Sequence, residues 1–333
     1  MNKFIVSPSP HTHSPESTQS IMRDVLIALT PAMLVSILAS GWSVLALICV
    51  SVVACVLLEF LIQKYWLKVP VTVTDLSAAV TGCLLALNLP PNAPWWIAVI
   101  GAIVAIGVAK MTFGGLGNNI FNPALVGRCA LLVAFPAQMT SWPLPGQWLR
   151  YTDAETGATP LELMKQAVKS GNMDMLAQLP DSFSLLFADL SLNGGAGTIG
   201  EVCDVALIAG LIFMLWRKII TWHIPVSIIG TVFVLSGLLH LASPVYAEPG
   251  VVILSGGLML GAIFMATDYV TSPMTPKGQL IYGVSIGFLT VVIRNWGAYP
   301  EGMSFAILIM NAFTPLINNY VKPKRFGEVP AEK

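Results

Sequence analysis

Long apolar runs constrain the fold of this chain more than any other feature of its sequence. A helix needs about 17 to 25 apolar residues to cross the hydrocarbon of a bilayer. Such runs lie at residues 22–40, 41–62, 74–90, 95–113, 121–137, 201–217, 224–241, 251–267, 279–294 and 304–321. Only 10% of the 333 residues are charged, against about a quarter in soluble proteins. We therefore predict an all-α integral membrane protein with about ten transmembrane helices. The composition excludes a stand-alone soluble enzyme.

The basic residues predict the orientation of these helices, because cytoplasmic loops carry an excess of Lys and Arg. With the N-terminus inside, the inner segments hold Lys3, Arg23, Lys64, Lys68, Lys110, Arg217, Lys218, Lys277, Lys322, Lys324, Arg325 and Lys333. The outer segments hold only Arg150, Lys165, Lys169 and Arg294. We therefore expect both termini to be cytoplasmic and a polar stretch at residues 138–200 to lie outside.

Two stretches of the sequence resemble each other and predict an internal repeat. LNLPPNAPWW (87–96) and FGGLGNNIFNPALVGR (113–128) form the first, and MATDYVTSPMTPKG (265–278) and NWGAYPEGMSFAILIMNAFTPL (295–316) form the second. In the orientation above, the first proline-rich part lies outside and the second inside. We therefore predict two inverted five-helix repeats, at residues 22–137 and 201–321. They are flanked by an N-terminal segment (1–21) and a tail (322–333), and residues 138–200 separate them.

Two prolines fall within the predicted spans, at Pro123 and Pro315. A proline removes a backbone donor, and a membrane tolerates this only where the freed groups face protein, water or a ligand. Broken helices in inverted repeats are typical of transport pathways. The alternative is that each proline only kinks a structural helix.

Ionisable residues inside the apolar runs are candidates for an ion path. They are Glu59, Asp75, Arg128 and Asp268. Each could instead reach an interface by extending its side chain. The five cysteines lie in or beside apolar runs and the four histidines are scattered, so we predict neither an iron–sulfur cluster nor a zinc site.

The polar stretch DAETGATPLE (153–162) carries the most specific motif. Thr159 as N-cap, Pro160 at the first helical position and Glu162 three residues after Thr159 predict a capping box and a helix that ends near Gly171. Capping does not explain the preceding Asp153-x-x-Thr156-Gly157-Ala158. Together with Thr159, these residues resemble the acceptor motif of bacterial flavin transferases, which join FMN through its phosphate to the hydroxyl of the last threonine.

The same motif occurs, in the same order with FGGLGNNIFNPALVGR, FMATDYVTSP and the N-terminal SPSPH, in one family. Over essentially its whole length the chain resembles the RnfD family, a membrane subunit of the Rnf ferredoxin:NAD⁺ oxidoreductase. It is more distantly similar to the NqrB subunit of the sodium-pumping NADH:quinone reductase. The resemblance implies a fold similar to urea and ammonium channels and a place in the bacterial inner membrane.

The resemblance also implies cofactors and partners. FMN would be bound covalently to Thr159 on the outer side, and a flavin transferase would recognise Asp153, Thr156, Gly157 and Ala158. The other subunits of a six-subunit complex, including a second subunit with covalent FMN, would be partners in electron transport coupled to Na⁺ or H⁺ movement. Glu59 and Asp268 would take part in ion uptake. A second, non-covalent flavin (riboflavin) is expected near Gly114, Gly115, Asn119, Asn122 and Arg128.

Two other functions stay open at this point. A redox-inactive channel or transporter for a small polar solute would explain the repeat and the broken spans but gives the acceptor motif no use. A subunit of the sodium-pumping quinone reductase would typically carry a longer N-terminal region than the 21 residues before the first run. The sequence chooses neither between Na⁺ and H⁺ nor between an ion path in this subunit and one in a neighbour.

Overall fold

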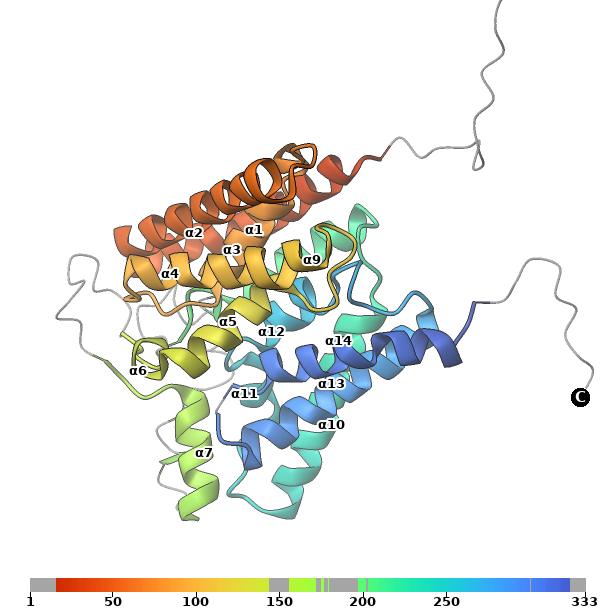
Figure 1. Ribbon diagram of the computed structural model, residues 1–333. Helices are drawn as coiled ribbons and strands as arrows, with labels where there is room; N and C mark the ends of the chain where they lie inside the picture. The colour runs from red at the N-terminus through yellow and green to blue at the C-terminus, as the bar shows by residue number, and fades with distance from the viewer. Residues whose placement is uncertain are drawn as a thin grey trace, which may run out of the picture.

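Helices connected by turns and loops make up the part of the protein that the computed structural model describes. This part comprises residues 16–143, 156–171, 175–176, 179, 197–201, 203–299 and 301–323. Within it, the only β-type pairing is an isolated bridge between Pro143 and Thr156. The helices lie side by side and the short α7 stands at one end of the bundle (Figure 1). The all-α class predicted from the sequence is confirmed for these residues.

The N-terminal half contains two long helices followed by shorter ones. Its helices are α1 (Thr18–Ser40), α2 (Trp42–Leu61), η1 (Ile62–Leu67), η2 (Val73–Asp75), α3 (Ser77–Leu87), α4 (Trp95–Ala102), η3 (Ile103–Lys110), η4 (Met111–Phe113), α5 (Pro123–Ala134) and α6 (Pro136–Met139). Here η1 and η3 are π-helical extensions of α2 and α4. A π-turn shifts the direction of the side chains that follow it and is frequent at functional sites.

The C-terminal half follows after α7 (Pro160–Ser170). It comprises η6 (Ile199–Glu201), α9 (Asp204–Trp216), α10 (His223–Ala242), α11 (Pro249–Leu254), α12 (Leu258–Leu260), η7 (Gly261–Met265), α13 (Pro276–Trp296) and α14 (Met303–Tyr320). The main helix pairs are α1 with α9, α2 with α3 and α4, α10 with α13, and α13 with α14.

Among the described residues, five helical segments are long and apolar enough to cross a membrane. They are Thr18–Ser40, Trp42–Leu67, Trp95–Phe113, His223–Ala242 and Pro276–Trp296. Three other predicted spans contain only the short helices α3, α5 and α9, with 11, 12 and 13 residues. At 1.5 Å per residue these reach about 16 to 20 Å, less than the roughly 30 Å of hydrocarbon. The multi-pass membrane class stands, while the number of spans and their repeat stay predictions.

The two prolines differ from the expectation. Pro123 is the first residue of α5 and does not interrupt a helix. At this position its missing N–H is one that a helix leaves unbonded in any case. Pro315 lies inside α14, which continues through it to Tyr320. Helix α1 also runs through a proline, Pro31. Pro315 therefore agrees with the alternative of a proline within a structural helix, whereas Pro123 follows a non-helical stretch at the start of α5.

Small residues allow the helices to cross closely. A Cβ atom placed at Gly82 of α3 would lie 2.7 Å from the Cα of Val52 in α2. A Cβ at Gly127 of α5 would lie 2.9 Å from the carbonyl oxygen of Gly101 in α4. Close backbone approach at glycine drives helix association where lipid removes the hydrophobic difference between helices.

The helix ends define two opposite faces of the molecule. At the terminal face, where α1 begins, Asp24 accepts two hydrogen bonds from Arg217 at the end of α9. Here, too, the backbone N–H of Met274 donates to Asn318 near the end of α14. At the acceptor face, where α1 ends, Ser36 donates to the carbonyl of Ile199. Helix α7 lies at the acceptor face, far from the first residues of α1 and the last of α14 (Figure 1).

Candidate functional site

Thr159 is the N-cap of α7. Its backbone is extended (φ −72°, ψ 152°) and its Oγ1 accepts a hydrogen bond of 3.1 Å from the backbone N–H of Glu162. The helix ends at Gly171, whose φ of 68° is in the left-handed region. The predicted helix and the Thr159 side-chain cap are therefore confirmed, while the second bond of the capping box, to the Glu162 side chain, stays a prediction. Because Thr159 is only 6% exposed, its hydroxyl is covered in this conformation.

The rest of the acceptor motif approaches α7 as a short extended segment. Thr156 forms the bridge with Pro143, and the backbone N–H of Gly157 donates to the carbonyl of Trp142 over 3.0 Å. Thr156 and Ala158 are exposed. The motif therefore presents its backbone at the surface. Asp153, predicted as a recognition residue, lies outside the described residues.

Helix α7 packs on the acceptor face through one apolar side. Leu161 and Met164 form a cluster with Ala247 and Val251, which lie beside and in α11. Nζ of Lys165 donates 2.5 Å to the carbonyl oxygen of Ala298. Burial in this contact lowers the pKa of the Lys165 ammonium. Helix α7 is thus held by apolar packing and by one lysine to the ends of α11 and α13.

The chain between α11 and α12 is held by a buried arginine, Arg294. Nη1 and Nη2 of Arg294 donate to the carbonyls of Val252 and Ser255 over 2.6 and 2.8 Å, where α11 ends and the chain is non-helical before α12. Arg294 is 6% exposed, which corrects its expected place in an outer loop. The α11–α12 break uses Arg294 to pair carbonyls that a helix would otherwise bond.

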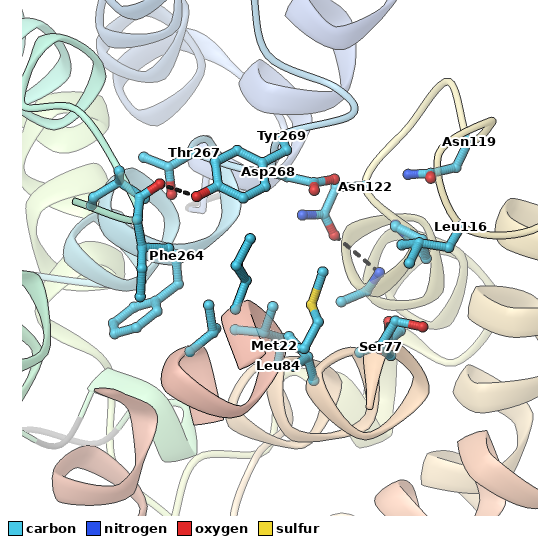
Figure 2. Close-up of a pocket in the computed structure, with 18 of the residues that line it drawn as sticks. Met22, Ser77, Leu84, Leu116, Asn119, Asn122, Phe264, Thr267, Asp268 and Tyr269 are labelled. Carbon is cyan, nitrogen blue, oxygen red and sulfur yellow. Dashed lines mark hydrogen bonds between the residues drawn. The ribbon is translucent and has the colours of Figure 1, made fainter. Parts of the chain in front are cut away.

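A cavity with apolar and polar walls lies near the terminal face, among α1, α3, α5 and the segment after η7. Its volume is about 90 Å³. It is lined by apolar side chains and by Ser77, Thr81, Lys110, Asn119, Asn122, Thr267, Asp268 and Tyr269. Figure 2 shows Asn119, Asn122 and Asp268 along its upper side and Ser77 opposite them. About 10 to 15 Å³ of such volume holds one water molecule, so this cavity suits a hydrated ion or several waters.

Asp268 is the acidic residue of this cavity. Its carboxylate accepts a hydrogen bond of 3.3 Å from Oγ1 of Thr271, and it is also bonded by the backbone N–H of Val270 and the side chain of Asn119. The ammonium of Lys110 acts on it electrostatically. The predicted ion-path residue therefore lines a cavity with amide and hydroxyl groups that suit a cation.

Glu59, the other predicted ion-path residue, lies outside this cavity. It is fully buried in α2, and its Oε2 accepts a bond of 2.6 Å from Nζ of Lys110. Nε2 of Gln63 donates to its other oxygen over 3.3 Å. The sequence treated Lys110 as a basic residue of an inner loop, and the structure corrects this, because Lys110 is 2% exposed. The sequence held one indication of this ion pair, because a carboxylate that is buried, as Glu59 is, needs a counter-charge.

A chain of hydrogen bonds leads from this ion pair to the terminal face. Nζ of Lys110 also donates to Oγ of Ser77 over 2.6 Å, and that hydroxyl donates to Oδ1 of Asp75 over 2.6 Å. Asp75 is partly exposed. The predicted residue Asp75 is therefore connected with Glu59 through Ser77 and Lys110.

The five residues predicted near a second flavin do not surround one cavity. Asn119 and Asn122 line the cavity, and Asn122 also caps α5. Gly114 and Gly115 form a turn with φ values of 106° and 91°. Arg128 lies in α5, where it pairs with Glu301 and donates to Asn88.

Small-molecule pockets have about 300 to 1,000 Å³, against the 90 Å³ found here. The second flavin stays a prediction. Among the described residues, no cluster of three His, Cys, Asp or Glu side chains could hold a metal ion.

The fold and cavity define a class: a helical membrane protein with buried charges and a polar cavity at one face, and a capped helix with an acceptor motif at the other. The chain belongs to the NQR2, RnfD, RnfE family, whose family model matches residues 5–327. This confirms the resemblance read from the sequence.

The relatives are subunits of ion-translocating complexes. A subunit of the Na(+)-translocating ferredoxin:NAD(+) oxidoreductase complex of Acetobacterium woodii is 45% identical over 328 residues, which is 98% of this chain and 96% of the relative. A subunit of the proton-translocating ferredoxin:NAD(+) oxidoreductase complex of Clostridium ljungdahlii is 41% identical over 330 residues, or 98% and 97%. A subunit of the ion-translocating oxidoreductase complex of Aliivibrio salmonicida is 37% identical over 356 residues, or 97% and 98%.

Proposed function

We propose that this chain is the RnfD-type membrane subunit of an ion-translocating ferredoxin:NAD⁺ oxidoreductase complex. The observation that carries the proposal is the 37 to 45% identity with subunits of such complexes over nearly the whole of both chains. The chain acts as part of a translocase and not alone. Its partners are the other five subunits of the complex, one of which also carries covalent FMN, and a flavin transferase that matures it.

FMN is joined to Oγ1 of Thr159 by a phosphoester in this proposal. The position fits a phosphate, because the N-terminus of a helix presents free N–H groups and the positive end of its dipole. The hydroxyl lies at that end of α7 and already accepts the N–H of Glu162. Its low exposure means that the segment 156–159 must open for the transferase. Bound FMN supplies electron transfer, and α7 fixes where this occurs.

The acceptor helix lies on the outer side of the bacterial inner membrane, and both termini lie inside, in two inverted repeats of five helices. The distribution of Lys and Arg along the sequence supports this orientation, as does the position of α7 at the face opposite the start of α1 (Figure 1). Ions pass through this subunit by way of the cavity at Asp268. One relative is named for Na⁺ and another for protons, so the ion is to be found by measurement.

Flavin fluorescence in a denaturing gel tests the proposal. The chain is co-expressed with a flavin transferase as wild type, Thr159→Ala and Thr275→Ala. Thr275 is a matched control: it caps α13, is followed by a proline, and its Oγ1 accepts the N–H of Gly278 over 3.1 Å. We expect fluorescence in the wild type and in Thr275→Ala and none in Thr159→Ala.

A dark wild-type band, with the transferase active on another substrate, would contradict covalent attachment. The competing function would then be a redox-inactive channel for a small solute. The cavity and the non-helical segments before α5 and α12 favour that alternative. An NqrB-like subunit of a quinone reductase would give the same fluorescence. The electron acceptor that the purified complex uses distinguishes this alternative from the RnfD-type subunit.

A further inference from the structure

One side of α2 and of its extension η1 is exposed along its whole length. Between Trp42 and Lys68 an exposed residue recurs every three or four positions, as on one face of a helix, among them Val53, Leu57 and Leu61. The opposite side holds the buried residues of α2 and packs on α3 and α4. The exposed stripe is therefore the surface that α2 turns towards lipid or a partner.

A groove runs along this stripe, between α2 and the start of α4. Its volume is about 540 Å³, within the range of sites that bind small molecules. All of its lining residues are apolar or cysteine, and they extend from Cys49 to Leu61 in α2, with Trp95 and Val99 from α4. At 1.5 Å per residue, the stretch from Cys49 to Leu61 is about 18 Å long. This is close to half of the roughly 30 Å of hydrocarbon, so the groove matches an acyl chain of one leaflet.

At the terminal face the stripe ends in a basic and aromatic loop. Every residue from 64 to 71 (KYWLKVPV) is exposed, and Trp66 is 82% exposed. Among the described residues, neither Lys64 nor Lys68 forms an ion pair. Nζ of Lys64 lies 5.1 Å from the ring centroid of Phe60, within the range of a cation–π contact. The loop therefore presents two uncompensated positive charges beside aromatic rings.

Hydrogen bonds at its base hold this loop in one shape. The chain turns at Lys68, whose φ is 53°, and the backbone N–H of Val69 donates to the carbonyl of Gln63 over 3.0 Å. The buried side chain of Gln63 accepts from the backbone N–H of Thr72 and donates to its Oγ1, each over 2.9 Å. A fixed loop that exposes apolar and basic side chains together is a surface for a partner.

The length of α2 and η1 places this loop at the level of the lipid headgroups. Trp42 and Tyr65 are about 35 Å apart along the helix, more than the roughly 30 Å of hydrocarbon. Aromatic residues at both ends of a span are typical of a helix that ends in the two membrane interfaces. Lysines in that position attract anionic headgroups, which gives Lys64 and Lys68 a partner of opposite charge.

The residue types of the stripe favour a lipid over a helix of another subunit. Helices in membranes associate through small residues and polar side chains, and α2 meets α3 in this way, at Gly82. The exposed residues of α2 from Trp42 to Leu61 include no Gly, Ser or Thr. The groove therefore lacks the features that bring a second helix close.

We propose that the groove between α2 and α4 and the loop at its end bind one anionic phospholipid. One acyl chain lies in the groove, and Lys64 and Lys68 bind the negatively charged headgroup. Tyr65 and Trp66 lie in the interface beside it. The lipid belongs to the inner leaflet in the orientation proposed above; the leaflet rests on that orientation, whereas the site does not.

Native mass spectrometry of the purified full chain measures this binding. The probes are phosphatidylglycerol and phosphatidylcholine with the same acyl chains, so that they differ in headgroup and in its charge. One lysine near an anionic headgroup strengthens binding about fivefold. We therefore expect the first phosphatidylglycerol to bind about 25-fold more tightly than the first phosphatidylcholine. The size-exclusion profile of each variant is the control for folding.

Two lysine substitutions test the headgroup site. Lys64→Gln and Lys68→Gln should each weaken binding of phosphatidylglycerol about fivefold. In Lys64→Gln/Lys68→Gln the loss should be about 25-fold, so that the two lipids bind equally. Lys277→Gln is the matched control, because Lys277 lies in the first turn of α13 at the same face, and it should leave both affinities unchanged.

A substitution in the groove tests the acyl-chain site. Leu57→Trp fills the groove and should weaken binding of both lipids at least about fivefold, with their ratio unchanged. Leu238→Trp is the matched control: Leu238 is 59% exposed on α10, against 53% for Leu57, and it lies outside the groove. It should bind both lipids as the wild type does.

Equal affinity of the wild type for the two lipids, or a preference that persists without both lysines, would mean that only unspecific boundary lipid binds, and would overturn the proposal. Equal effects of Leu57→Trp and Leu238→Trp would exclude the groove from the site. The same titration of the whole complex tests the competing occupant, since loss of the phosphatidylglycerol site there would mean that a helix of another subunit covers it. These results leave the proposed function untouched, because none of them depends on FMN at Thr159 or on ion movement.

Discussion

Replacing Lys110 by methionine isolates what the buried ion pair contributes to stability. The change removes both hydrogen bonds of the ammonium, to Glu59 and to Ser77, each 2.6 Å long. It leaves the Glu59 carboxylate buried, with a single bond of 3.3 Å from Gln63. Breaking a buried pair by removing one partner destabilises a protein by about 3 to 5 kcal/mol. We expect Lys110→Met to fall in this range.

The double variant Glu59→Gln/Lys110→Met should recover most of that loss, because neither member of the ion pair is then charged and no carboxylate is left without its partner. Replacing a buried pair by uncharged groups of similar volume is often close to neutral. The assay is reversible unfolding of the purified chain by SDS in mixed micelles, which gives a free energy for each variant. Equal destabilisation in Lys110→Met and in the double variant would show that the unpaired Glu59 carboxylate is not the cause.

Two further predictions concern packing and α7. Gly82→Ala should lower the free energy of unfolding by about 1 to 3 kcal/mol, because its Cβ would lie 2.7 Å from Cα of Val52. Gly230→Ala is the control and should not lower it, because no atom lies within 4 Å of its Cβ. Unfolding of both variants in SDS checks this. Burial lowers the pKa of the Lys165 ammonium in docked α7 below its ordinary value of 10.5. Between these two pKa values the undocked segment binds more protons than the docked one, so docking of α7 should strengthen as the pH rises from the lower to the higher value. The hydrogen-exchange protection factors of α7 should therefore rise with pH in the wild type and in the control Lys169→Met. The same rise in Lys165→Met would contradict a role of Lys165.

The sequence predicted the positions of the helices better than their lengths. An apolar run is recognised from its composition, whatever the order of its residues. The helices α1, α2, α10 and α13 therefore lie close to where they were expected. The run at 74–90 holds only α3, because Asp75 and Leu76 form a turn before it, with Leu76 at a φ of 65°. A non-glycine residue in the left-handed region has no signature in hydropathy.

The charged residues show where reading from sequence fails. Lys110 and Arg294 lie near the ends of apolar runs, where a basic residue normally marks the beginning of a loop. The structure buries both, because Lys110 compensates Glu59 and Arg294 pairs carbonyls at the α11–α12 break. Glu59 is 51 residues from Lys110 in the chain, and Val252 is 42 residues from Arg294. Only the packing of distant helices determines such pairs. Thr159, by contrast, is readable, because its cap and its motif are local.

In the proposed function, FMN is bound to the hydroxyl of Thr159. The most direct measurement is mass spectrometry of the tryptic peptide YTDAETGATPLELMK (151–165) from chain co-expressed with a flavin transferase. We predict the peptide mass increased by one FMN less one water, with fragment ions that assign the addition to Thr159 and not to Thr152 or Thr156. The unmodified peptide alone, or an addition on another residue, would contradict the account.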